Sequence, residues 1–126
     1  MAFMLLIVEP RGQRDLRSPE DARRRYDDMM AFGKDLQERG LLRASESLCT
    51  DDNAVRVSHV GDGAQLRPQL RDGPFAEAKE MVGGFFLIDV ATRDEAVAIA
   101  RRCPAAFWSS VEVRECAPCY TPRAIA

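Results

Sequence analysis

The stretch from residue 71 to residue 90 reads RDGPFAEAKEMVGGFFLIDV, and it joins a turn, several ionisable side chains, a double glycine and an apolar run. Asp72-Gly73-Pro74-Phe75 has turn chemistry, because aspartate accepts from backbone N–H groups two residues on, glycine permits positive φ and proline fixes the next φ. Gly83-Gly84 precede the apolar run from Phe85 to Val90, which predicts a buried strand starting after the glycines.

The residues before this stretch predict two strands, a long helix and a hairpin. FMLLIV at residues 3–8 is typical of a strand buried on both faces. Ser18-Pro19-Glu20-Asp21 combines an N-cap serine, a proline at the first helical position and acids in the first turn, so a helix runs from here to Gly40. LLRASESL then predicts a strand, and VRVSHV pairs with residues 65–70 as a hairpin.

The residues after it predict a second helix and a last strand. Thr92-x-x-Glu95 is a capping box, and it opens a helix that ends at Cys103-Pro104. VEVREC at residues 111–116 alternates as a strand. We expect one domain over residues 1–116 and a C-terminal tail over residues 117–126.

The order β-α-β, hairpin, β-α-β predicts an α+β ferredoxin-like sandwich with an inserted β-hairpin. Two helices can cover only one face of its sheet, yet FMLLIV and FFLIDV carry large apolar residues at both parities. The bare face would be a larger apolar patch than soluble monomers expose, so we expect a homodimer that packs sheet against sheet. The space between the facing sheets is the first place predicted for a pocket.

The composition excludes several classes of function. The 126 residues contain 18 basic and 20 acidic side chains, a net charge of −2, which predicts no direct nucleic-acid binding and no attraction to anionic membranes. No apolar run approaches the roughly 20 residues of a membrane span, and the N-terminus lacks the basic residue of a secretory signal. We expect a cytoplasmic protein.

The cysteines and the single histidine do not predict a metal site or a cofactor. Cys116 and Cys119 form a C-x-x-C pair, but it follows a strand, whereas a reactive dithiol draws its low thiol pKa from a helix N-terminus. A zinc site would need two more ligands from Cys49, Cys103 or His59, which form no second close pair. Free thiols are expected.

The chain resembles the YCII-related proteins, and in particular their DGPF subgroup, over nearly its whole length. The matching segments are FMLLIV, Ser18-Pro19-Glu20, Gly40-Leu41-Leu42, Asp72-Gly73-Pro74-Phe75-Ala76-Glu77 with Lys79, Gly83-Gly84-Phe85-Phe86-Leu87-Ile88, Ala100-Arg101-Arg102-Cys103-Pro104-Ala105 and Val111-Glu112-Val113-Arg114. The resemblance implies a ferredoxin-like dimeric α/β barrel.

The resemblance also implies a histidine–aspartate pair that this chain lacks. In the founding branch the histidine lies on the first long helix, and the aspartate precedes a proline at the end of the second. Met29 stands at the histidine position, and Cys103 precedes Pro104 in place of the aspartate. The general base of that branch and its orienting partner are therefore missing.

The remaining candidates for chemistry lie in residues 72–79, which we call the DGPF loop. We predict Asp72 as the leading acid/base group, with Lys79 as its electrostatic partner and Glu77 beside them, because a carboxylate near a lysine in a dry cleft can transfer protons. The side chains expected to line the pocket are Tyr26, Met29, Phe75 and Cys103. The alternative is structural: Asp72 caps the turn, while Glu77 and Lys79 form an exposed ion pair.

Two functions follow from these patterns. The first is a cofactor-independent small-molecule lyase or isomerase that transfers protons in a dimer-cleft pocket, by analogy with superfamily members assigned to ring cleavage and dehydrochlorination. The alternative is a non-catalytic ligand-binding or regulatory module, because proteins resembling this one are often encoded beside, or fused to, extracytoplasmic-function sigma factors.

Overall fold

A computed structural model describes residues 1–120 of the chain. The strands are β1 (Ala2–Pro10), β2 (Leu42–Ser47), β3 (Val55–Val60), β4 (Arg67–Asp72), β5 (Glu80–Asp89) and β6 (Ser110–Glu115). The helices are α1 (Pro19–Glu38) and α2 (Arg93–Arg102), with short 3-10 turns η1 (Gln13–Leu16), η2 (Asp51–Asn53), η3 (Gly63–Gln65) and η4 (Pro104–Phe107). Most of the expected tail, residues 121–126, lies outside the described residues.

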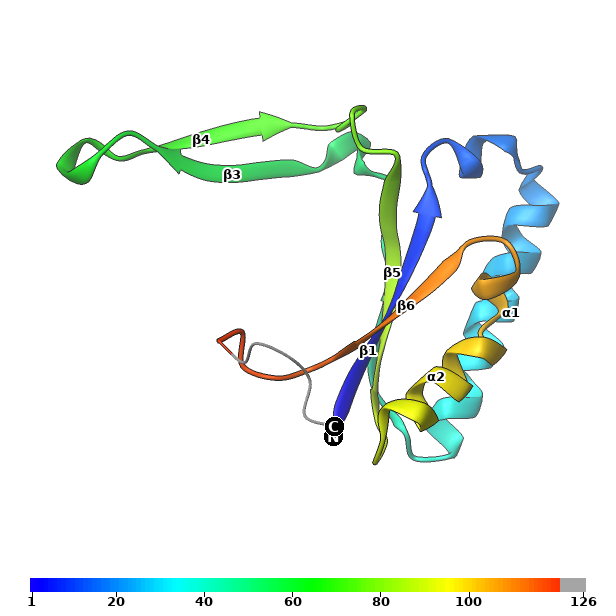
Figure 1. Cartoon of the computed structure of the whole chain (residues 1–126). Coiled ribbons are helices and arrows are strands. Elements are labelled where there is room, and N and C mark those ends of the chain that lie inside the picture. The colour runs from blue at the N-terminus through cyan, green and yellow to red at the C-terminus, as the bar shows by residue number, and fades with distance from the viewer. Residues whose placement is uncertain (121–126) are drawn as a thin grey trace.

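Four strands form one antiparallel sheet in the order β2-β5-β1-β6, and both helices lie on the same face of it (Figure 1). The strand that begins the chain therefore lies between two strands from its second half. This arrangement confirms the predicted α+β ferredoxin-like sandwich. Within residues 1–120, neither helix is long and apolar enough to cross a membrane.

Both helices begin where their capping residues predict. The Ser18 hydroxyl accepts a hydrogen bond from the N–H of Asp21, and Pro19 occupies the first helical position. Thr92 accepts from the N–H of Glu95, whose carboxylate in turn accepts from the N–H of Ala91. Each cap satisfies backbone donors that the helix itself leaves unpaired, a contribution of about 1 kcal/mol.

The strand after the DGPF loop begins earlier than the sequence predicts. We expected it to start after Gly83-Gly84, whereas β5 already begins at Glu80 and contains both glycines. The register against β1 shifts here, because Ile7 faces Gly84 and Val8 faces Val82, which leaves Gly83 in a β-bulge. Glycine is common at bulges, so the double glycine marks an irregularity inside the strand and not its start.

The hydrophobic core lies between the sheet and the helices. Phe3, Leu5 and Ile7 alternate along β1 toward this side, and all three are buried. They pack in one cluster with Leu36 of α1 and Ala96 of α2. Period-two burial in the strand and a helical stripe in α1 thus meet in a single core.

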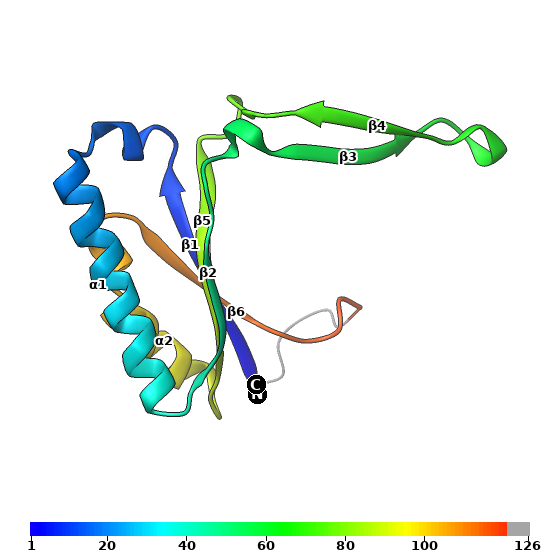
Figure 2. The same ribbon diagram turned by 180° about the vertical axis from the view of Figure 1, so that it is seen from behind.

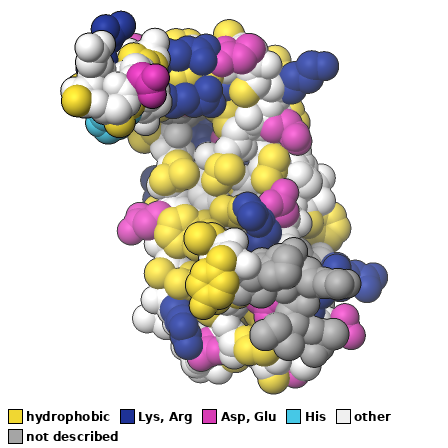
Figure 3. All heavy atoms as spheres, turned by 60° about the vertical axis from the view of Figure 1, so that its left-hand side comes forward, with side chains coloured by type: hydrophobic (Ala, Val, Ile, Leu, Met, Phe, Trp, Pro, Cys, Tyr) yellow, Lys and Arg dark blue, Asp and Glu magenta, His cyan; other side chains and the backbone are white. Residues whose placement is uncertain are grey.

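The opposite face of the sheet carries no helix. Met4, Leu6 and Val8 alternate with the core residues of β1 and are only half-buried, and they lie opposite residues of β5 that are also apolar. In the space-filling view, hydrophobic side chains gather over this face (Figure 3). The homodimer stays a prediction, and a second copy of the chain on this face would cover these side chains.

Strands β3 and β4 form a separate two-stranded sheet, which we call the arm (residues 55–72). The arm projects away from the main sheet on the side opposite the helices (Figures 1 and 2). Its apolar side chains are exposed, including Val57 at 62% and Leu70 at 64%. An isolated hairpin is only marginally stable in water, so the arm depends on its anchor at the base.

Candidate functional site

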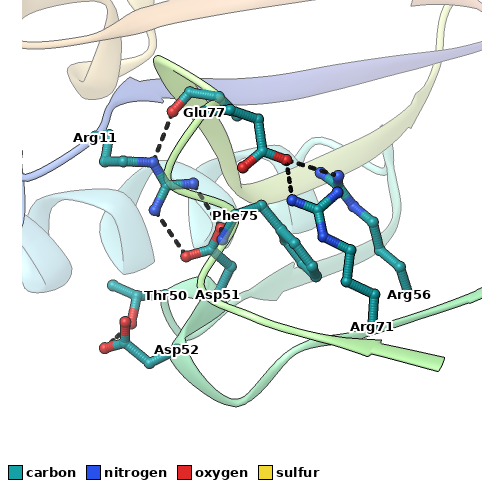
Figure 4. Close-up of polar contacts among 9 residues, drawn as sticks. Arg11, Thr50, Asp51, Asp52, Arg56, Arg71, Phe75 and Glu77 are labelled. Carbon is teal, nitrogen blue, oxygen red and sulfur yellow. Dashed lines mark hydrogen bonds and ion pairs between the residues drawn. The ribbon is translucent and has the colours of Figure 1, made fainter.

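The DGPF loop forms the anchor of the arm, and an aspartate from another part of the chain organises it (Figure 4). The Asp51 carboxylate, in η2, accepts a hydrogen bond from the N–H of Phe75 at 3.1 Å. It also accepts hydrogen bonds from both terminal guanidinium nitrogens of Arg11, at 2.9 and 2.5 Å. Arg11 also donates from Nε to the carbonyl of Ala78 at 2.7 Å. Asp51 thus makes the carboxylate contact with the loop that we expected of Asp72.

Phe75 and Gly73 fill the centre of this anchor. The ring of Phe75 is 4% exposed, and the Arg56 guanidinium lies 3.8 Å from its centroid, with that of Arg71 at 5.4 Å. A Cβ atom at Gly73 would lie 2.0 Å from the backbone carbonyl oxygen of Asp51, a distance that no side chain tolerates. The signature residues Gly73 and Phe75 therefore join the arm to the body of the domain.

The three residues predicted to transfer protons are not brought together. Glu77 pairs with Arg71 at 2.5 Å and Arg56 at 3.7 Å, so the expected local pair between Glu77 and Lys79 is wrong. Two arginines from the arm are closer to this carboxylate than the lysine is. Asp72 and Lys79 are exposed, and their predicted roles, which would need a partner subunit to enclose them, stay predictions.

The ion pair of the anchor predicts a pH dependence. Hydrogen bonding to Arg11, helped by the N–H of Phe75, lowers the pKa of Asp51 from 3.8 to about 2. A carboxyl whose pKa is depressed by folding stabilises the folded state above its unfolded pKa, and this contribution is lost as pH falls from about 4 to about 2. We expect urea denaturation to show that Asp51→Asn lowers stability at pH 6 and that the deficit narrows toward pH 2.

The control for this prediction is Asp62→Asn, which removes a carboxylate near the tip of the arm, far along the chain from the anchor. This variant is expected to be as stable in urea as the wild type at both pH values. A deficit for Asp51→Asn that stays constant between pH 6 and pH 2 would contradict the assignment.

A cavity with a volume of about 840 Å³ lies between α1 and the sheet. This volume falls within the range of small-molecule sites, roughly 300–1,000 Å³. Its apolar wall includes Ile7 and Phe86 of the sheet, Met30 of α1 and Trp108 after η4. The sequence placed the first pocket between facing sheets, whereas this cavity lies on the helix side of a single chain.

A buried carboxylate lies in this cavity. Glu9, at the end of β1, is 4% exposed, and its Oε1 lies 2.7 Å from Nη2 of Arg14 while its Oε2 accepts from Nε at 3.2 Å. The Oε1 contact is off the N–H direction, so it is an ion pair without an aligned hydrogen bond, and Oε1 has no other partner within residues 1–120. This oxygen retains the capacity to accept a proton or a hydrogen bond.

The bulge in β5 makes room for this ion pair. A Cβ atom at Gly83 would lie 2.7 Å from Glu9 Oε1 and 2.8 Å from Arg14 Nη2. The carbonyl of Gly83 also accepts a long hydrogen bond of 3.5 Å from the same guanidinium. The double glycine therefore serves the site by letting two charged side chains approach the backbone of the strand.

Two of the predicted pocket residues line the cavity, and two do not. Tyr26 and Met29 of α1 are in its wall, whereas Phe75 belongs to the arm anchor and Cys103 is buried beneath the cavity lining. The Sδ of Met29 nevertheless lies 3.9 Å from the Sγ of Cys103. The two positions that replace the histidine and the aspartate thus meet, and burial raises the pKa of the Cys103 thiol, which keeps it protonated at neutral pH.

A polar network centred on Gln13 connects Arg17 and Trp108, two residues of the cavity wall. Gln13 donates to the carbonyl of Trp108 at 2.5 Å, and its Oε1 accepts from Ser109 Oγ at 2.8 Å and from Arg17 Nη2 at 2.9 Å. Arg25 stacks on the Trp108 ring at 4.9 Å. The segment between β1 and α1 is thereby tied to the segment between α2 and β6.

The charged residues of the cavity are those that sequence reasoning missed. Glu9 follows Phe3, Leu5 and Ile7 at the same two-residue spacing, so its side chain points into the core with theirs. A carboxylate on the inward face of a strand is a signal of a functional or paired group. Arg14 and Arg17 gave no comparable signal, because their placement depends on the short turn η1.

Metal ligands do not cluster in the part of the chain that the structure describes. No group of three or more histidine, cysteine or carboxylate side chains could hold a metal ion in residues 1–120. Cys49, Cys103, Cys116 and Cys119 are free thiols, and all but Cys103 are exposed.

Fold and site together define a ferredoxin-like domain with a cavity beside its first helix. The chain belongs to the YCII-related family, since the model of the YCII-related domain matches residues 1–119. It is 34% identical over 101 residues, 80% of this chain and 78% of the other, to the uncharacterized protein R00369 of Rhizobium meliloti (strain 1021). These matches confirm the family resemblance seen in the sequence.

The fold is also similar to that of a solved structure. This is 5-chloro-2-hydroxyhydroquinone dehydrochlorinase (TftG) from Burkholderia phenoliruptrix AC1100 in complex with 2,5-dihydroxybenzoquinone, with a TM-score of 0.51. The alignment covers 93% of this chain and 94% of that chain at 15% identity. At this identity the likeness concerns the fold.

Proposed function

We propose that the protein is a cofactor-independent lyase or isomerase that acts on a small molecule in the cavity between α1 and the sheet. The observation that carries this proposal is the buried Glu9 carboxylate, whose Oε1 accepts no hydrogen bond from residues 1–120. The dehydrochlorinase of similar fold supports the reaction class by analogy.

The cavity supplies the parts that proton transfer needs. Glu9 is held beside the Arg14 guanidinium at 2.7 Å, and a positioned carboxylate can take a proton from a bound ligand. Apolar walls limit water around a bound ligand, and this strengthens electrostatic interactions inside the cavity. Glu9 would accept a proton from a carbon or hydroxyl of the ligand and return it at another atom, or keep it while a leaving group departs.

The test uses halogenated hydroquinones, with 5-chloro-2-hydroxyhydroquinone as the first probe, and measures chloride release together with the product. We expect Glu9→Gln to lower turnover by roughly 100-fold or more, since a general base contributes about 10²–10⁴. Asp72→Asn is the matched variant in the DGPF loop, and we expect it to retain turnover. If Glu9→Gln retains turnover and Asp72→Asn loses it, the active site lies in the DGPF loop and the assignment to the cavity is wrong.

A second function, a non-catalytic ligand-binding module, is favoured by one specific observation. The Met29–Cys103 sulfur pair occupies the positions expected for the general base and its orienting partner, and neither a thioether nor a protonated buried thiol is an efficient proton carrier at neutral pH. Under this reading the cavity binds the same ligands without converting them, and a regulatory link to a sigma factor becomes a separate proposal. Saturable binding without turnover in wild-type protein would favour it.

A further inference from the structure

The cavity has an excess of cationic side chains over acids. Its lining includes Arg14, Arg17, Arg25 and Lys34, against the two carboxylates Glu9 and Glu46. An excess of one sign within low-dielectric walls focuses the field and attracts ligands of the opposite sign. The composition of the whole chain, with its net charge of −2, does not reveal this local bias.

Most of these cations already have a partner or are solvated. Arg14 pairs with Glu9 at 2.7 Å, and Arg25 pairs with Asp21 at 3.1 Å while it stacks on Trp108. Lys34 is exposed on α1, so water solvates its ammonium group. Arg14, Arg25 and Lys34 therefore do not need a bound anion as a partner.

Arg17 differs from the other three. Within residues 1–120 it forms no ion pair, its Nη2 donates to the neutral amide of Gln13, and its Nε is buried without a hydrogen-bond partner. Burial, reinforced by the nearby positive charge of Arg25, lowers the pKa of Arg17, although a guanidinium stays protonated at neutral pH. Arg17 as a whole is half-buried, so the cost lies with its buried Nε donor, and an anion beside this nitrogen would supply the hydrogen-bond partner that it lacks.

The geometry points to a specific class of ligand: we infer that the cavity binds a small carboxylate with an apolar ring, whose carboxylate pairs with Arg17. A guanidinium presents paired N–H donors that match the two oxygens of a carboxylate. The ring would lie against Met30, Phe86 and Trp108, which form the apolar wall. Gln13 is a positioning residue, because its Oε1 accepts a hydrogen bond from Arg17 Nη2 and so holds this side chain in the cavity wall.

This inference rests on the proposed function, because both concern the same cavity. It adds that the ligand carries a negative charge at the end of the cavity where Arg17 and Trp108 lie. Glu9 would then face the uncharged part of the same molecule, since its own carboxylate repels a second one. The roles divide between Arg17 for binding and Glu9 for proton transfer.

The experiment compares 2-naphthoate with its uncharged counterpart 2-naphthamide by titration calorimetry on the full chain. Wild-type protein is expected to bind the carboxylate at least tenfold more tightly than the amide. Arg17→Gln is expected to weaken carboxylate binding at least tenfold and to leave amide binding within about twofold. Arg101→Gln, an exposed arginine of α2 outside the cavity, is the matched control and should bind both compounds as the wild type does.

The outcomes separate this inference from the proposed function. Equal affinity for the two compounds in the wild type, or a carboxylate preference that survives in Arg17→Gln, overturns the inference and leaves a neutral-ligand enzyme in place. Failure of both compounds to bind up to millimolar concentration overturns the inference and removes the support for the cavity as a ligand site. Thermal melting of each variant checks that lost binding does not reflect lost folding.

Discussion

Arg14→Met is expected to lower the free energy of unfolding by about 3 kcal/mol at pH 7, because it leaves the Glu9 carboxylate buried without its counter-ion. The carboxylate is 5% exposed and its Oε1 has no other partner within residues 1–120, so water cannot readily replace the guanidinium. Chemical denaturation in urea measures the loss directly.

The control for Arg14→Met is Arg23→Met, which deletes an arginine from a pair that is largely in solvent. Arg23 and Asp27 are 78% and 58% exposed, and exposed pairs of this kind contribute about 0–1 kcal/mol. A double variant, Glu9→Leu with Arg14→Met, removes both charges and is expected to recover most of the loss. If the two single arginine variants are equally stable, the ion pair does not hold the end of β1 as we describe.

Phe75→Ala is expected to cost about 3 kcal/mol, since it removes a buried aromatic ring and with it the surface on which two arm arginines stack. The arm has no core of its own, so loss of this ring releases both β3 and β4. We expect faster amide hydrogen exchange in residues 55–72, together with the drop in global stability measured in urea.

Phe107→Ala is the matched control, because Phe107 carries the same side chain at 82% exposure. Substitution of such a surface residue changes stability by less than about 0.5 kcal/mol. Equal stability of the two phenylalanine variants, or unchanged exchange in the arm of Phe75→Ala, would show that the DGPF loop does not anchor the hairpin. That result would favour an acid/base role for the DGPF residues over a structural one.

The signature shows why a motif does not reveal its own role. Asp72 has the chemistry of an acid/base group, yet its side chain is exposed, while Asp51, more than twenty positions earlier, accepts the N–H of Phe75. No local spacing predicts that Asp51 takes the place of Asp72 as the acceptor. This contact depends on the tertiary structure, which places η2 beside the base of the arm. The loop was found in the sequence, and its contacts were not.

The cavity provides a second example. The burial pattern of β1 turns Glu9 inward with Phe3, Leu5 and Ile7, although the apolar run at both parities concealed this in the sequence. The apolar stripe of α1 brings Tyr26 and Met29 to the cavity wall. Arg17 could not be assigned in this way, because its environment is built from η1, α1 and the segment after η4. The local charge of a cavity depends on which side chains are neighbours in space, so the net charge of the whole chain does not reveal it.

What the sequence determined by itself was the order and type of the elements: two capped helices, apolar central strands, a hairpin and a ferredoxin-like sheet with one bare face. These follow from local backbone preferences and side-chain spacing, which act within a few residues. Only the tertiary structure decided that Glu9 and Arg14 meet at the bulge of Gly83 and that the Nε of Arg17 is buried without a hydrogen-bond partner within residues 1–120. Burial of these side chains depends on segments that are distant in sequence, such as the strand around Gly83, so only the folded chain shows which charges are desolvated and which are paired.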